Sequence, residues 1–136
     1  MAHPAVTTGD LAMLLDDVID RVAPAENAVA MSPDGLLLAA SRGTTDAVAN
    51  QISTVVAGLY ALSVAAGQFS EHGSVRQVTV EMRRSFLFVT AAKGGAILAV
   101  IFGAGSDVGV IAYEMALFAG RADRHLPAFT RLATVT

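Results

Sequence analysis

A glycine-rich segment is the first candidate for ligand chemistry in this sequence. Gly103–Gly109 reads GAGSDVG, and it follows a strand-like run and precedes a helix-like one. Glycines in that position bind a dinucleotide diphosphate when they are spaced G-x-G-x-x-G within a βαβ unit. Here the third glycine comes one residue too late, and only 12 residues follow the expected helix, which ends at Arg124. We therefore expect a tight strand-to-helix turn and no nucleotide site.

Histidines and carboxylates are the next candidates, because they bind metals and transfer protons. His3, His72 and His125 lie far apart, and none is followed three or four residues later by a histidine or a carboxylate, so no metal site is expected. The G-x-S-x-G motif and the G-K-[ST] phosphate loop are both missing from the sequence. Glu81 and Glu114 fall on the polar sides of their segments. The sequence thus predicts no catalytic residue, no cofactor and no enzyme.

Charge and composition narrow the class of protein further. The net charge is −3, whereas nucleic-acid-binding proteins usually show a basic patch. Hydrophobic residues make up 54% of the 136 residues and charged residues only 15%, which excludes a disordered chain and suggests self-association. There is no cysteine, which fits a reducing compartment, and the first residues lack the basic stretch of a signal peptide. We expect a cytoplasmic protein.

The longest uncharged stretch invites comparison with a membrane-spanning helix. It covers the 24 residues between Asp46 and Glu71, but seven polar side chains interrupt it. Its most apolar part, Ile52–Ala66, has 15 residues, whereas a spanning helix needs about 20 predominantly apolar residues. We therefore expect a soluble protein without membrane insertion.

The hydrophobic periodicity predicts one domain over residues 8–126, with 1–7 and 127–136 as flexible tails. Helices are expected at 8–22, 46–69 and 107–124, and strands at 27–32, 36–41, 75–82, 85–92 and 96–102. Short loops, including the Ser32–Gly35 hairpin turn SPDG, favour antiparallel neighbours. The runs at 85–92 and 96–102 are apolar on both faces, which is typical of central strands. The fold class is α/β, layered: a five-stranded antiparallel sheet with helices on both faces, in the order α-β-β-α-β-β-β-α.

The first two predicted helices carry different surface patterns. In the first, Asp16, Asp17 and Asp20 lie opposite the apolar stripe, and we expect a solvated face, with an acidic docking surface as the alternative. The second has no charged face at all. The stripe predicted to pack on the sheet is Ile52, Val55, Leu59, Leu62 and Ala66. The opposite side consists of small or apolar residues, namely Ser53, Thr54, Ala57, Ala61, Val64 and Ala65.

A helix that is apolar all round is normally buried all round. A chain of 136 residues leaves no further layer to cover the second side of this helix, so we expect an interface between subunits. A deep core helix is the alternative.

The element order and three segments resemble the Roadblock/dynein light chain family, and its bacterial members that accompany Ras-like small GTPases in particular. The segments are Ala30–Ala39, Gln51–Leu59 and Asp107–Met115, within a resemblance that covers Asp10–Arg124. The resemblance implies the Roadblock, profilin-like architecture. It also implies a homo- or heterodimer in which the second helices pack together and the third strands pair.

Transferred to this sequence, the resemblance places the dimer interface on two elements. The residues concerned are Ser53, Thr54, Ala57, Ala61, Val64 and Ala65 in the second helix, and Gln77 and Thr79 in the third strand. It implies a non-catalytic scaffold that docks a Ras-like small GTPase, often beside a histidine-kinase-like sensor. The residues expected to contact that partner are Asn50, Gln51, Tyr60 and Gln68, for which a role as the rim of the dimer interface is an equally good interpretation. The turn residues Arg83 and Arg84 are further candidates, for which simple solvation is the competing interpretation.

An alternative function belongs to a different class. Antiparallel five-stranded sheets flanked by helices also serve as PAS- and GAF-like ligand sensors. A sensor needs an apolar cavity with a few convergent polar groups. The expected core of valine, alanine, leucine, isoleucine and phenylalanine can fill the interior, so the sensor stays the second hypothesis.

Overall fold

The computed structural model describes residues 8–127 apart from 23, 69–72, 74 and 106, so most of both predicted tails lies outside the described residues. The elements are α1 (Thr8–Arg21), β1 (Ala25–Met31), β2 (Leu37–Ala40), α2 (Asp46–Gln68), β3 (Gln77–Glu81), β4 (Ser85–Ala91), β5 (Ile97–Gly103), α3 (Val108–Ala122) and the short 3-10 turn η1 (Asp123–His125). The predicted order is confirmed, with element ends shifted by one or two residues.

The five strands form one antiparallel sheet in the order β2-β1-β5-β4-β3. β5 lies at the centre with β4 beside it, as their apolar faces predicted, and Ile97, Leu98, Ala99 and Val100 are all buried. β2 and β3 are the edges. In β3 the exposed polar residues alternate with half-buried valines, which fits its position at the rim of the sheet.

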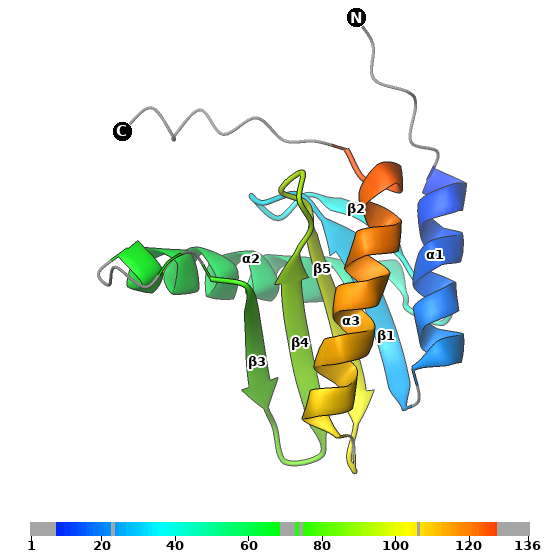
Figure 1. Cartoon of the computed structure of the whole chain (residues 1–136). Coiled ribbons are helices and arrows are strands. Elements are labelled where there is room, and N and C mark those ends of the chain that lie inside the picture. Colours follow the sequence, from blue (N-terminus) through cyan, green and yellow to red (C-terminus); the bar gives the residue numbers. More distant parts are fainter. Residues whose placement is uncertain (1–7, 23, 69–72, 74, 106, 128–136) are drawn as a thin grey trace, which may run out of the picture.

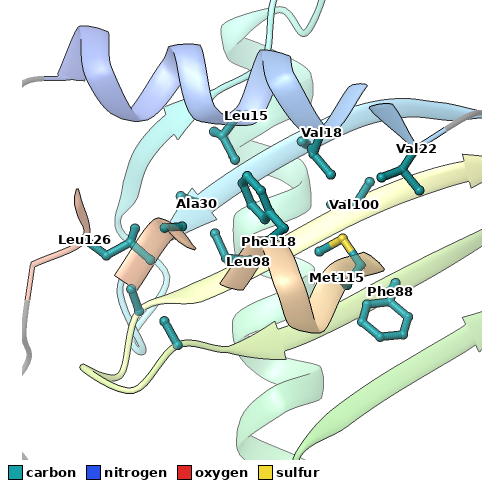
Figure 2. Packing of buried hydrophobic residues seen from close by; sticks show 14 of the residues in the cluster. Leu15, Val18, Val22, Ala30, Phe88, Leu98, Val100, Met115, Phe118 and Leu126 are labelled. Carbon is teal, nitrogen blue, oxygen red and sulfur yellow. The ribbon is translucent and has the colours of Figure 1, made fainter. Parts of the chain in front are cut away.

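Helices cover both faces of the sheet, which gives three layers (Figure 1). Residues of β5 alternate between two clusters: Leu98 and Val100 pack with α1 and α3, whereas Ile97 and Ala99 pack with α2. Figure 2 shows Leu15 and Val18 of α1 and Phe118 of α3 on the first of these faces, turned toward the strands. Each face thus has its own apolar core.

The connection from β2 to α2 is fixed to β1 by Ser41, whose side chain is buried. The Ala28 N–H donates to Ser41 Oγ at 3.0 Å, and the Ser41 N–H donates to the Ala28 carbonyl at 2.8 Å. The Thr44 hydroxyl joins this network at 3.2 Å from Ser41 Oγ. These bonds set where α2 starts, and from there the helix crosses behind the strands and extends past β3 (Figure 1).

Among the described residues, α2 is long and apolar enough to cross a membrane by length and composition, with a hydropathy of 1.4. Core helices of soluble proteins meet the same two criteria. In this structure Ala49 and Val56 of α2 pack on the sheet. The absence of membrane insertion remains a prediction.

Candidate interaction surface

The exposed side of α2 is unusually apolar for a helix surface that faces solvent. Val48, Val55 and Leu62 recur at seven-residue intervals and are 39%, 57% and 72% exposed. No charged residue lies between Asp46 and the end of the helix. We call this surface the α2 face, and its other exposed members are Ala47, Gln51, Thr54, Gly58, Ala61, Ala65 and Ala66. Contiguous exposed apolar surface of this kind marks interaction sites in soluble proteins.

The predicted packing stripe of α2 is partly wrong. Ile52 and Leu59 do pack on the sheet, but Val55, Leu62 and Ala66 are exposed. The residues that α2 buries are Ala49, Ser53 and Val56. The helix is therefore turned about its axis relative to the prediction.

The hairpin between β1 and β2 explains this rotation. Gly35 has a φ of 96°, and a Cβ built on it would lie 3.1 Å from the Ala57 Cβ and 3.6 Å from the Ser53 carbonyl oxygen. Such a close approach requires small side chains on α2. The small side chains of Ser53 and Ala57 thus allow α2 to pack closely against the β1–β2 hairpin.

The predicted interface residues of α2 divide into three groups. Ser53 is only 1% exposed, so its assignment to a subunit interface is wrong, because the chain itself covers it. Ala57 and Val64 are half-buried. Thr54, Ala61 and Ala65 are exposed members of the α2 face.

The residues predicted to contact a partner also differ in exposure. Asn50, Gln51 and Gln68 are exposed, and the Asn50 amide donates to the Asp46 carbonyl at 2.9 Å. Tyr60 is half-buried and packs with the α2-side core, so its prediction as an exposed flank needs correction. Asn50 and Gln68 thus lie toward the two ends of the helix, whereas Gln51 and Thr54 are polar members of the α2 face itself.

β3 adds a second exposed feature next to α2. Among the described residues it pairs with β4 alone, so its other edge has no neighbouring strand. Gln77, Thr79 and Glu81 are exposed, whereas Val78 and Val80 are half-buried in the α2-side core. An edge strand of this kind is a template for pairing with another chain.

The turn after β3 holds Arg83 and Arg84, both exposed. The Met82 N–H donates to the Ser85 carbonyl at 2.8 Å and closes the hairpin. No described non-glycine residue has a positive φ. The two arginines therefore close the turn without the left-handed backbone that tight hairpins favour.

A groove of about 550 Å³ lies on the opposite face of the sheet, between α3 and the β3–β4 hairpin. Its walls include Ala112, Ala116 and Ala119 of α3, and Phe88, Arg76 and Gln77 of the strand side. The Thr90 hydroxyl donates to the Arg76 carbonyl at 3.2 Å. In the described part of the chain, no buried side-chain nitrogen or oxygen lacks a hydrogen-bond partner.

The glycine-rich segment forms the predicted strand-to-helix turn, although Ser106 lies outside the described residues. Gly105 has a φ of 83°. Asp107 caps α3, because its Oδ1 accepts from the N–H groups of Gly109 at 2.9 Å and Val110 at 3.2 Å. A phosphate at this helix N-terminus would have to displace that carboxylate.

The acidic side chains of α1 are paired with arginines. Asp16 and Asp20 both contact Arg42, and Asp17 lies 2.9 Å from Arg21. This pairing favours a solvated face over an acidic docking surface. Within the described residues, no group of three or more histidines or carboxylates is placed to hold a metal ion; His3 and His72 fall outside those residues.

The sequence of this chain matches the family model of the Roadblock/LC7 domain over residues 11–102. No curated protein matches the chain. The fold is similar to a crystal structure of a Roadblock/LC7 domain from Streptomyces avermitilis, with 36% identity and a TM-score of 0.76; the match covers 82% of this chain and 92% of that one.

Two more distant structures share the fold. One is MglB, described with a tetrameric arrangement, at 17% identity and a TM-score of 0.78, with 92% of this chain and 93% of that one covered. The other is profilin IB of Acanthamoeba castellanii, at 18% identity and a TM-score of 0.52, with 73% and 85% covered. The profilin-like architecture is thereby confirmed.

Proposed function

This chain belongs to the Roadblock/LC7 domain family, and we propose that it is a dimeric, non-catalytic adaptor that docks a Ras-like small GTPase. The family match supports a small adaptor or regulator. The single observation that carries the dimer is the α2 face, which exposes Val55 and Leu62 on a helix without charge after Asp46, beside an edge of β3 that pairs with no other described strand. A second copy that covered both features would remove this apolar surface from water.

The dimer is tested by placing a charge on the α2 face. Leu62→Arg should shift the protein from dimer to monomer at micromolar concentration, because an unpaired buried charge is strongly unfavourable at an interface. Met13→Arg is the matched control, since Met13 on α1 is 69% exposed and Leu62 is 72% exposed. Sedimentation velocity reads the outcome. A folded wild-type monomer, or an L62R variant that stays as dimeric as M13R, contradicts the proposal.

The mechanism that we propose requires no chemistry by this chain. A protein without catalytic groups regulates a GTPase by binding one of its nucleotide states more tightly than the other. A tenfold preference corresponds to about 1.4 kcal/mol. The proposed contacts are Asn50 and Gln68, which border the α2 face, Gln51 within it, and the exposed pair Arg83 and Arg84.

The GTPase partner is tested by affinity in two nucleotide states. We expect tighter binding to the cognate GTPase in one state, measured by calorimetry with GDP and with a non-hydrolysable GTP analogue. Gln68→Arg should weaken this binding, because Gln68 is exposed and lies outside the α2 face, while Asp10→Arg on the far side of the sheet serves as a control. Equal affinities for the GDP-bound and GTP-bound states would mean that the protein only tethers the GTPase. Absence of binding in both states would contradict the proposal.

The proposal includes the cytoplasm as the location, because a GTP-dependent switch works where GTP is present. A histidine-kinase-like sensor remains a further proposed partner. The family match favours this adaptor over the ligand-sensor alternative. Calorimetric titration with a metabolite panel, in the absence of any protein partner, separates the two functions.

A further inference from the structure

The α3 side of the sheet is only partly covered. In Figure 1, α3 lies in front of the central strands, and no described helix lies in front of β3. Neighbouring residues of a strand point to opposite faces, and Val78 and Val80 pack in the α2-side core. The exposed side chains of Gln77, Thr79 and Glu81 therefore point to the α3 side. The groove of about 550 Å³ lies between them and α3.

The wall that α3 contributes to this groove consists of small side chains. Ala112, Ala116 and Ala119 line the groove at intervals of four and three residues, which places them on one face of the helix. Gly120 leaves further space beside them, because a Cβ built on it meets no atom within 4 Å. Tyr113, one turn before Ala116, is 64% exposed and adds an aromatic ring. Such a wall suits the apolar face of a second helix, which can approach to about 8–10 Å between axes.

The cations of the described chain fall into two groups. Arg21, Arg42 and Arg121 form salt bridges with aspartates of α1. The other five are exposed and form no salt bridge with a described residue, namely Arg76, Arg83, Arg84, Lys93 and Arg124. Each of these five lies within two residues of an end of β3, β4 or α3. The unpaired positive charge is therefore gathered on the elements that form the groove.

Three of these cations lie at one end of the groove. Arg76 lines the groove itself. The pairing of Gln77 with Thr90 places Arg76 and Lys93 at the same end of the β3–β4 pair. α3 starts beyond the end of β5 and runs back along the sheet, which brings its C-terminal end and Arg124 of η1 to this end as well (Figure 1). A ligand with carboxylates would form charge-assisted hydrogen bonds there.

The carboxylates of the same segments do not neutralise this end of the groove. Glu81 lies at the other end of β3. Glu114 comes about two helical turns before Arg121, so it lies on the side of α3 where Arg121 contacts α1. Asp123 adjoins Arg124 in sequence but forms no salt bridge with it. The positive charge is thus available to a partner.

We propose that the groove between α3 and β3 binds an acidic amphipathic helix of a partner protein. The apolar side of that helix packs on the alanines of α3, and its carboxylates contact Arg76, Lys93 and Arg124. A lipid surface is flat and does not reach the walls of a groove. The site lies on the opposite face of the sheet from the α2 face, so it goes beyond the proposed GTPase contact and does not rest on the dimer.

A designed peptide tests the charge and the shape of the groove together. The probe is a fluorescein-labelled helix of about 18 residues, with leucines on one side and glutamates on the other. Its anisotropy should show saturable binding to the wild type at low ionic strength. The same peptide with lysines in place of the glutamates should not bind, and neither should one with alanines in place of the leucines.

Variants of the protein locate the binding site. Arg76→Glu should weaken binding of the acidic peptide by about tenfold, and Arg21→Glu on α1 is the control with the same change in net charge. Ala116→Trp should block the groove, and Met13→Trp on exposed α1 is its control. Leu62→Arg should keep the wild-type affinity for the peptide, because the α2 face takes no part. Far-ultraviolet circular dichroism checks that each variant is folded.

The alternative outcomes each overturn the proposal. Equal affinity for the acidic and basic peptides removes the charge argument, and no binding of the acidic peptide removes the site. Binding that R76E and A116W leave unchanged, or that L62R abolishes, places the peptide elsewhere on the molecule. Phosphatidylglycerol vesicles that co-sediment with the wild type but not with R76E, when the peptide does not bind, would assign Arg76 to a lipid surface.

Discussion

At the level of individual residues, some structural features could be predicted from the sequence and others could not. The SPDG turn could be predicted, because it depends on neighbours within a few positions. The Asp107 cap and the alternating exposure of β3 depend on equally local neighbours. The role of Ser53 could not be predicted from the sequence. Its burial depends on the contact between α2 and the hairpin around Gly35, which is distant in sequence. A small side chain on a helix allows close approach of either a second subunit or a loop of the same chain, and the residue type does not distinguish these two cases.

Gly35 offers a test of that contact. Gly35→Ala and Gly43→Ala both place a side chain at positive φ, 96° and 81°, which costs roughly 1–2 kcal/mol. Only at Gly35 does the new Cβ meet another group, at 3.1 Å from the Ala57 Cβ; at Gly43 there is none within 4 Å. We expect G35A to lose about 1 kcal/mol more than G43A in urea unfolding at equal protein concentration. Equal losses would show that the hairpin does not constrain α2.

At the scale of elements, the order, the strand directions and the central position of β5 all followed from local patterns. The rotation of α2 about its axis did not follow from them. Periodicity identifies the buried face of a helix only when the helix is amphipathic. α2 has apolar or small residues on every side, so several orientations bury similar surface. The groove beside α3 was also missed, since it depends on which strands α3 covers. Ala112, Ala116 and Ala119 in the sequence gave only a weak sign of a recessed helix face.

The start of α3 is held by one side chain, which permits a test at the level of the element. Asp107→Ala removes the acceptor of the Gly109 and Val110 N–H groups and should cost about 1 kcal/mol of unfolding free energy. Asp107→Asn keeps an acceptor oxygen and should cost much less. Chemical denaturation at fixed protein concentration measures both. A D107N loss as large as that of D107A would assign the effect to the carboxylate charge rather than to the cap.

At the scale of the whole molecule, the few charges are placed unevenly. α1 carries a solvated face with paired aspartates, whereas α2 leaves Leu62 and Val55 exposed with no charge beside them. Charged residues are therefore scarcest on the α2 face, which no other element of the described chain covers.

If folding and association are coupled, thermal stability must depend on protein concentration. About 0.7 kcal/mol per residue near 60 °C gives an unfolding enthalpy of about 190 kcal/mol for two 136-residue chains. A tenfold rise in concentration should then raise Tm by about 3 °C, and a hundredfold rise by about 5 °C. Scanning calorimetry of the wild type and of L62R over that range measures the slope. The variant should show none, because a monomer unfolds independently of concentration, and a flat wild-type response would mean that the single chain is the unit that unfolds.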